Sequence, residues 1–541
     1  MDNLRLIIDE LDLENALVVA SKRNDLLPRR PDEGVGGEVG QRFLEGLRSR
    51  VTLATYRPDR AVLIAVPKPR YVTRPASLLT LSDRTLLQAL VARLAPAIEE
   101  QLVSPETVFA HRATQPKGKW ADFEARPLRE NPAYVVRADV FGFYEYVPHD
   151  TLREALIDKT GDRVAAAAVH ELLTAFSGPP RGLPQGNRAS DVLATLFLDA
   201  VDRSMLRAGL DYCRYGDDVR IAVDSFDSGR GAVSRLENAL RQCGLALNGA
   251  KTSVLRRETY ERQVRDADEA RQELRNRLIT ARTAALRDRA EAAETLEELE
   301  GIFPEELLWD LYADRATVED AIAAMEPLLE PDVTEIVERL YAETMEHAPW
   351  KKSGGMRKAA FHGRLVSSLR LMANVGSTIA VHDLRQLLYW APDETDEIAR
   401  YLRLAVDYAA DDIKAEVEGF LRQDRFRHEW QEAWLLEVLA RCLPLSDEMN
   451  GWLQGRAAVE DGHWLGRTHA MLVLAIQGLA DRRLLERAWE LAPAVFRAEL
   501  IATGRWLQGQ QAWAPQFLEG CRGDPVLEVV ITHVTQQLES L

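Results

Sequence analysis

The chain has 541 residues, a length that suits about two to four domains with sizeable hydrophobic cores. Its composition, 46% apolar and 28% charged, is ordinary for a soluble protein. We find no run of about eighteen apolar residues and no basic-then-apolar leader, which argues against a membrane span and against secretion. The four cysteines lack the spacing of a metal site, so we expect reduced thiols and a cytoplasmic protein.

The net charge of −17 is unevenly distributed along the chain. Residues 1–260 hold 36 lysines and arginines against 35 aspartates and glutamates, and the remaining residues carry a net charge of −18. Because phosphate attracts positive charge, contact between the near-neutral first half and nucleic acid requires basic residues that are gathered locally.

Two basic segments occur in this first half. Residues 66–75 interleave basic with aromatic and β-branched residues, a pattern that suits a bound polyphosphate or, alternatively, a solvated edge strand. The candidates in this segment are Lys68, Arg70 and Arg74. Residues 109–120 combine basic and aromatic residues that suit backbone phosphate or a stacked base, and an ordinary surface loop is the alternative. The candidates there are Arg112 and Lys119.

The run from Tyr134 to Tyr144 predicts a strand that ends in an acid, Asp139, followed by aromatic residues. Pro148 suits the start of a helix, and a helical pattern continues over residues 151–157. We therefore expect Asp139 at a strand end, where a neighbouring hairpin could present further acids.

A glycine-rich turn follows at residues 182–190 and leads into an apolar helix from about residue 191 to residue 205. Its two glycines and one proline form a tight turn that allows close approach of another group. Taken alone, this segment favours an ordinary loop before a core helix.

Asp217 and Asp218 lie at the tip of a hairpin predicted over residues 212–223, and Gly216 opens its turn. Adjacent acids at a solvated turn gain little stability and repel each other, whereas a cation such as Mg²⁺ would bind both. With Asp139 nearby, three carboxylates could hold two Mg²⁺ ions about 3.5–4 Å apart. This arrangement serves phosphoryl transfer.

In order and spacing, these motifs resemble motifs A to D of the palm of reverse transcriptases. Motif A is the strand with Asp139, motif B is the segment 182–186, motif C is the segment 215–218, and motif D runs over residues 244–252. The resemblance covers roughly residues 1–255. It implies an α+β polymerase right hand, with fingers and N-terminal helices over residues 1–130 and a palm over residues 131–255.

The resemblance also implies a catalytic role for four residues. Asp139, Asp217 and Asp218 correspond to the catalytic acids that bind two Mg²⁺ ions, with Mn²⁺ as an alternative. Lys251 corresponds to the motif D lysine near the leaving pyrophosphate, where it could donate a proton or supply charge.

Further residues correspond to the family's nucleotide site. Lys68 and Arg74 match the basic residues of the fingers that embrace the triphosphate, with Arg70 as a rival for either role. Gln185 and Gly186 match part of the surface for the template and the incoming nucleotide.

Tyr144 corresponds to the steric gate beneath the 2′ position of the nucleotide sugar. RNA-dependent RNA polymerases also carry Gly-Asp-Asp, but they usually have a second acid at this position to engage the 2′-hydroxyl. Because a bulky ring there would exclude ribose, we expect dNTPs as the substrates.

The second half of the chain is predicted to be helical almost throughout. Residues 258–299 have few helix breakers, which predicts one or two long, charged helices. By position after the palm, the resemblance implies a thumb-like or connector region over residues 256–345, with a coiled-coil partner helix as the alternative. Residues 346–541 resemble an all-α domain of HEAT-like repeats, with helix pairs at a period of about forty residues. A basic cluster within this half suits contact with nucleic acid or a solvated linker, and its members include Lys351, Lys352 and Lys358.

A compact polymerase followed by helical repeats resembles the bacterial defence-associated reverse transcriptases of the abortive-infection and unknown-group type. This resemblance implies an RNA-directed or untemplated DNA polymerase that acts in defence against bacteriophage. The expected partners are an RNA template, a DNA product and dNTPs, with a non-coding RNA and a homo-oligomer as further options and no membrane. The alternatives are a retron-like or intron-derived enzyme, and a scaffold or toxin sensor whose helical region binds a protein.

Overall fold

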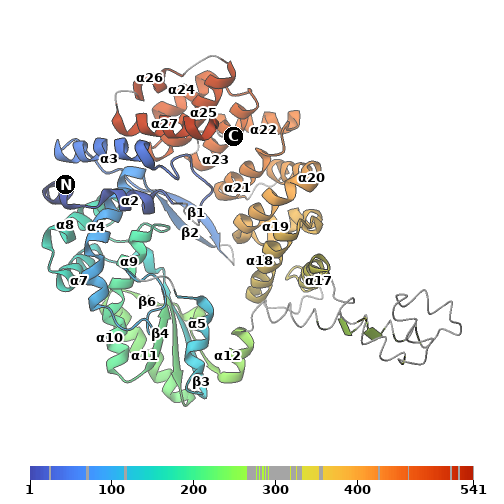
Figure 1. The fold of residues 1–541 in the computed structure, drawn as a ribbon. Coiled ribbons are helices and arrows are strands. Elements are labelled where there is room, and N and C mark those ends of the chain that lie inside the picture. The colour runs from blue at the N-terminus through green and yellow to red at the C-terminus, as the bar shows by residue number, and fades with distance from the viewer. Residues whose placement is uncertain are drawn as a thin grey trace. The chain divides into compact units, whose positions relative to one another are not determined.

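A computed structural model describes most of the chain (Figure 1). The described residues are 1–22, 26–68, 72–114, 118–264, 332–351, 358–423, 427–460, 462–511, 515–521 and 524–539, with a few isolated positions between 265 and 331. They form two compact units, the first made of residues 1–264 and 418–541 and the second of residues 265–417. Arg70, Lys352, the side chain of Lys358 and most of the predicted thumb-like region lie outside the described residues.

The first unit opens with helices that flank a two-stranded hairpin. The elements in order are α1 (Asp2–Ile7), η1 (Ile8–Glu10), α2 (Leu13–Ala20), α3 (Gly37–Thr52), β1 (Val62–Lys68), β2 (Val72–Leu78), α4 (Leu81–Gln101), α5 (Trp120–Ala125) and η3 (Arg126–Leu128). Side-chain caps set two of the helix starts. Asp12 accepts from the backbone N–H of Asn15 in α2, and Thr80 accepts from that of Asp83 in α4.

An antiparallel sheet follows and carries Asp139. Its strands are β3 (Tyr134–Phe141), β4 (Asp211–Tyr215), β5 (Asp218–Val223), β6 (Ala246–Leu247) and β7 (Ser253–Arg256). They lie in the order β4-β5-β3-β6, and β7 also pairs with β3. The third strand continues two residues past Asp139, because Val140 and Phe141 pair with β6.

Helices enclose this sheet and share its hydrophobic core. They are α6 (Phe143–Tyr146), α7 (His149–Thr160), α8 (Arg163–Phe176), α9 (Arg188–Phe197), α10 (Asp199–Arg207), α11 (Phe226–Gln242) and α12 (Arg257–Val264), with the short turn η4 (Gly249–Lys251) before β7. The single helix predicted over residues 191–205 is in fact two, α9 and α10. Asp199 begins the second of them, where Lys159 and Arg203 hold its buried carboxylate at 2.9 and 2.7 Å.

The C-terminal helices belong to the first unit as well. They are α21 (Glu429–Leu439), α22 (Asp447–Ala458), α23 (Trp464–Ile476), α24 (Arg482–Leu491), η8 (Ala494–Phe496), α25 (Arg497–Gln511), α26 (Gln516–Gly520) and α27 (Pro525–Glu539). Val526 and Val529 lie in the same hydrophobic cluster as Phe43. Buried Arg30 forms an ion pair with Glu499 at 2.8 Å. These helices therefore complete the core of the N-terminal segment.

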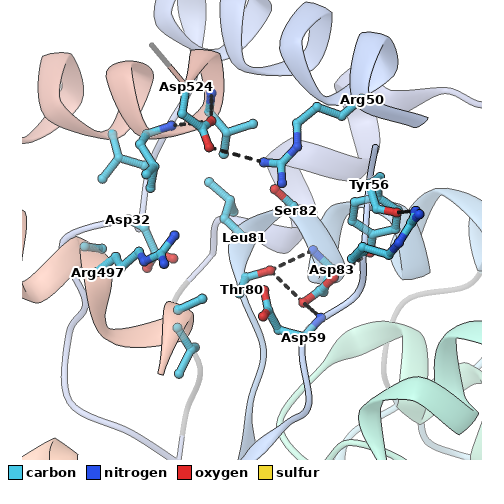
Figure 2. A pocket seen from close by; sticks show the side chains of 17 residues that line it. Asp32, Arg50, Tyr56, Asp59, Thr80, Leu81, Ser82, Asp83, Arg497 and Asp524 are labelled. Carbon is cyan, nitrogen blue, oxygen red and sulfur yellow. Dashed lines mark hydrogen bonds and ion pairs between the residues drawn. The ribbon is translucent and has the colours of Figure 1, made fainter. Parts of the chain in front are cut away.

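A cavity of about 90 Å³ lies where the N-terminal and C-terminal segments of this unit meet (Figure 2). Arg50 reaches across it to Asp524, with 3.8 Å between the guanidinium and the carboxylate. Burial raises the pKa of Asp59 in its wall, and the charges of Arg497 and Arg50 partly offset the effect. Charges from both segments thus face each other across a small polar cavity.

The regular elements described in the second unit are all helices. Its elements are α17 (Val333–Glu346), α18 (Lys358–Val375), η6 (Ile379–Asp383), α19 (Leu384–Trp390), η7 (Pro392–Glu394) and the first part of α20 (Thr395–Gln423), which is kinked at Ala409. No helix within the described ranges is long and apolar enough to cross a membrane. The region after the sheet is thus largely helical, as predicted, while the domain boundary at residue 346 stays a prediction.

Candidate active site

The hairpin predicted over residues 212–223 is present and places two acids at its tip. Strands β4 and β5 pair from Asp211 to Ala222, and the register leaves only Gly216 and Asp217 in the loop. Gly216 has a φ of +63°, a backbone conformation that glycine adopts without strain. The short loop therefore holds the carboxylates of Asp217 and Asp218 close to the end of the sheet.

The third acid, Asp139, arrives from the neighbouring strand. Asp139 and Asp218 are directly paired positions of the antiparallel strands β3 and β5. The backbone carbonyl of Asp217 also accepts a hydrogen bond from the N–H of Val140 at 3.3 Å. Two segments that are far apart in the sequence thus bring three acids together at one end of strands β3 and β5.

The electrostatics of this edge favour binding of a cation. Burial, followed by the charges of Asp139 and Asp218, raises the pKa of Asp217 to about 6. Burial also raises the pKa of Asp218, although Arg220, 3.6 Å from its carboxylate, opposes the shift. Ionised carboxylates here are therefore under-compensated by the positive charge of the protein.

Asp139 differs from the other two acids because its carboxylate already has partners. One oxygen accepts from the side-chain amide of Asn248 at 2.8 Å, and the other contacts the ammonium of Lys251 at 2.9 Å. The backbone N–H of Asn248 also donates to the carbonyl of Asp139 at 2.8 Å. Pairing of β6 with β3 thus brings motif D onto motif A.

The three acids fit a pair of divalent cations by their chemistry. Carboxylate oxygens are the donors that Mg²⁺ and Mn²⁺ prefer. Among the residues that the structure describes, these three acids do not form a group in which one oxygen from each lies within 4.8 Å of the other two. Like charges repel, and Asp139 is held by Lys251 and Asn248, so wider spacing is expected for the protein by itself.

Tyr144 lies beside these acids and is held by a residue that the sequence analysis did not single out. Its hydroxyl donates to the carboxylate of Asp191 in α9 at 2.7 Å. Burial and then the charge of Asp191 raise the pKa of the Tyr144 hydroxyl, so that it stays protonated. His111 approaches the other oxygen of Asp191 at 3.3 Å. Asp191 directly follows Ser190, the last residue of the glycine-rich turn, and this adjacency is the only signal in the sequence.

The motif B loop is tied by hydrogen bonds to the strand β2 and to the backbone of Tyr144. The backbone N–H of Gln185 donates to the hydroxyl of Ser77 at 3.2 Å, and its carbonyl accepts from the N–H of Ser77. Leu183 donates to the carbonyl of Tyr144 at 2.7 Å. Gly186 has a φ of +91°, which an L side chain rarely adopts. The loop is thus fixed next to the acids.

The two basic residues expected to bind triphosphate lie on the β1–β2 hairpin. Lys68 ends β1, and Arg74 pairs with Val66 on the opposite strand. Burial and the nearby charges of Arg74 and Lys251 lower the pKa of Lys68, while Asp217 opposes this shift. Lys68 therefore lies within the electrostatic field of the acids.

The comparison with protein families agrees with this geometry. Residues 66–274 match the family model described as Reverse transcriptase (RNA-dependent DNA polymerase). The chain contains a reverse transcriptase domain. The match indicates an RNA-directed DNA polymerase, a nucleotidyltransferase that acts on a nucleic-acid template and dNTPs, and the family normally uses divalent metals. No curated protein matches the chain.

Beneath the β4–β5 hairpin, the reverse transcriptase domain contains a fully buried ion pair. The guanidinium of Arg214 in β4 contacts the carboxylate of Asp202 at 2.7 and 2.8 Å, and both side chains are 0% exposed. Arg214 also donates to the carbonyls of Thr195 and Gly216 at 2.9 and 3.2 Å. It thus links α9, α10 and the hairpin tip. Sequence analysis missed it, although an arginine amid a buried strand is itself a signal.

The structure describes only some of the residues that were expected to contact nucleic acid away from the three acids. Arg112 was predicted to face phosphate, but it is 4% exposed, and its guanidinium contacts Glu99 at 2.5 Å and the carbonyl of Val103 at 2.7 Å. This burial leaves it no exposed face for nucleic acid, so the prediction for Arg112 is wrong. Lys119 and Lys351 are exposed.

Proposed function

We propose that the chain synthesises DNA with two divalent cations, Mg²⁺ or Mn²⁺, held by Asp139, Asp217 and Asp218. The observation that carries this proposal is the register of β3 and β5, which puts Asp139 opposite Asp218 and beside the two-residue loop with Asp217. Bound cations would activate the attacking 3′-hydroxyl and neutralise the leaving pyrophosphate. RNA-directed synthesis is the expected activity, and untemplated extension is an alternative that the same acids would serve.

The basic residues around the acids have distinct roles in this proposal. Lys68 and Arg74 bind the triphosphate from the β1–β2 hairpin, because positive charge stabilises the polyphosphate and the charge that develops on it. Lys251 lies near the leaving pyrophosphate. Its ammonium contacts Asp139 at 2.9 Å, and its side chain is 63% exposed, so it can release that carboxylate to a cation and turn towards phosphate.

Tyr144 selects the sugar in this proposal. Its ring would exclude a 2′-hydroxyl, and the hydrogen bond to Asp191 at 2.7 Å holds the phenol in place. Gln185 and Gly186, fixed to β2 through Ser77, form part of the surface for template and incoming nucleotide. The enzyme should therefore use dNTPs and reject NTPs.

The activity is tested with purified protein and the variant Asp217→Ala. We expect metal-dependent incorporation of dNTPs in the wild type, abolished by chelation and in the variant. Reactions with and without an RNA template separate copying from untemplated extension, and sequencing of co-purified nucleic acid identifies the natural template and primer. Equal incorporation by both proteins would refute the assignment of the acids.

We further propose that this DNA synthesis serves defence against bacteriophage, and that residues 346–541 form HEAT-like repeats. The support is the order of the parts, a reverse transcriptase domain followed by a largely helical region. Cells carrying the gene should resist phage in plaque assays, and cells with Asp217→Ala should not. Protection by that variant would favour a scaffold or sensor role. Size measurement and sequencing of bound RNA would test the homo-oligomer and the non-coding RNA.

Exposed lysines outside the catalytic edge are proposed as weaker nucleic-acid contacts. Lys119 lies in the reverse transcriptase domain, and Lys351 lies in the second unit. Lys→Glu changes at each should weaken binding and reduce its dependence on salt, because fewer counterions are released. Filter binding across a salt series measures this, and unchanged binding would exclude the residue.

A further inference from the structure

A second cluster of metal-ligating side chains lies in the second unit. It consists of His362 from α18 and of Asp393 and Glu394 from η7. The ring nitrogen Nδ1 of His362 lies 3.2 Å from a carboxylate oxygen of Asp393 and 3.1 Å from one of Glu394. One ligand atom from each residue lies within 4.8 Å of the others.

Hydrogen bonding alone does not account well for this cluster. A single imidazole nitrogen carries at most one hydrogen, yet two carboxylate oxygens approach the same Nδ1. One proton serves one of these contacts well and the other poorly. A cation placed among the three atoms would instead be shared by all of them.

Burial raises the cost of any unpaired polar atom in this cluster. The side chains of His362 and Asp393 are 9% and 7% exposed. The second oxygen of Asp393, Oδ1, is buried and has no hydrogen-bond partner among the described residues. An unpaired oxygen of a buried carboxylate is costly, and a cation bound at this carboxylate would offset that cost.

We propose that His362, Asp393 and Glu394 bind a divalent transition-metal ion of the zinc type. One imidazole and two carboxylates are a common donor set for such an ion, and three protein ligands leave a further position open. A tetrahedral zinc ion needs about 3.3–3.5 Å between neighbouring ligand atoms, given bonds of about 2.0–2.2 Å. The observed separations of 3.1 and 3.2 Å therefore need to widen by only a few tenths of an ångström.

This site differs from the proposed site of the polymerase cations in its ligands and in the effect of a bound ion. Imidazole suits zinc, whereas the all-carboxylate edge around Asp217 suits Mg²⁺ or Mn²⁺. Because His362 and Glu394 come from different elements, a bound ion would clip α18 to the segment that precedes α20. We therefore expect a structural effect within the second unit and no role in phosphoryl transfer.

The test uses full-length protein, Zn²⁺ as the probe, and the variants His362→Gln and Glu394→Gln. His382→Gln is the matched control, because His382 is an exposed histidine of the same unit. After loading and dialysis, elemental analysis should find one equivalent more zinc in the wild type and in His382→Gln than in the other two. Zn²⁺ should raise the Tm of the wild type and the control only.

Circular dichroism guards against misfolding of a variant, and Glu394→Gln, the mildest change, keeps the test valid if His362→Gln does not fold. Cobalt substitution gives an independent readout, since the visible absorption of bound Co²⁺ should be lost in both cluster variants. Equal zinc content in the wild type and both cluster variants would overturn the proposal. Absence of retained zinc from the wild type would also overturn it, and the cluster would then be an ion pair of protonated His362.

Discussion

Acidic residues at the tip of the β4–β5 hairpin and beneath its strand β4 lie in opposite surroundings. At the tip, Asp217 and Asp218 are half-buried, and the nearest arginine is 3.6 Å from Asp218. Beneath the strand, Asp202 is fully buried and contacts Arg214 at 2.7 and 2.8 Å, with a further hydrogen bond from Tyr212 at 2.8 Å. Only a few residues of chain separate Arg214 from Asp217.

This difference shows which acids the protein neutralises by itself. A buried carboxylate without a partner is very unfavourable, so Asp202 is matched by a guanidinium and a phenol. Burial and mutual repulsion raise the pKa values of the tip acids, so a bound proton or a bound cation would relieve their charge. Structural acids should therefore control stability, and tip acids should control activity.

The largest expected effect comes from Asp217→Asn. Removal of a ligand of the catalytic cations should lower the rate of dNTP incorporation by about 10³-fold or more, since stabilisation of phosphoryl charge has effects of this size. The fold should persist, as measured by circular dichroism. A rate within tenfold of the wild type would show that the tip acids are not catalytic.

Arg214→Met should mainly lower the stability of the fold, whereas Asp217→Asn should mainly lower activity. It leaves Asp202 buried without its cation, which should cost about 3–5 kcal/mol of unfolding free energy. Urea unfolding measures the loss. The control is Glu237→Gln, which breaks an exposed pair with Arg241 and should cost about 0.5 kcal/mol or less. Similar losses of unfolding free energy in both variants would show that the buried pair of Arg214 and Asp202 stabilises the fold no more than an exposed pair.

Tyr144→Ala tests whether the residue beside the tip selects the sugar. Loss of the ring should relax discrimination against NTPs by about tenfold to a hundredfold, the range typical of a steric pocket. The measurement is the ratio of kcat/KM for a dNTP and its matching NTP. If the wild type already used both equally, Tyr144 would not be a gate.

Asp191→Ala should shift the same ratio less, by about tenfold, because it strands the Tyr144 hydroxyl without its acceptor. Asp191→Asn keeps an acceptor oxygen and should restore most of the discrimination. An equal defect in both variants would point to the charge of Asp191 rather than to its hydrogen bond.

The smallest effect concerns pH and the stability of the metal-free protein. Burial raises the pKa of Asp217 in the folded protein to about 6, from an ordinary value of 3.8. Its protonated form is favoured by folding, so its contribution is fully present below pH 3.8 and is lost as pH rises through about 6. In chelator, Asp217→Asn should become more stable than the wild type across this window, by on the order of 1 kcal/mol. A gap in Tm that is constant with pH would contradict this origin.

The acids that we propose to be catalytic could be singled out from the sequence because each lies in a local pattern. Gly216 followed by Asp217 and Asp218 between two strand-like runs specifies a tight turn, and the run before Asp139 specifies a strand. The order of the motifs then indicated the reverse transcriptase domain. Lys251 and Tyr144 were singled out in the same way, by their offsets from these motifs, and their roles stay predictions.

Contacts between distant parts of the chain were decided only by the tertiary structure. The hydrogen bond from Tyr144 to Asp191, the pairing of Arg214 with Asp202, and the burial of Arg112 are not visible in local periodicity. The same holds for the C-terminal helices, which share a hydrophobic core with the N-terminal segment. Turn and strand preferences are properties of neighbouring residues, whereas these contacts depend on which surfaces the folded chain brings together.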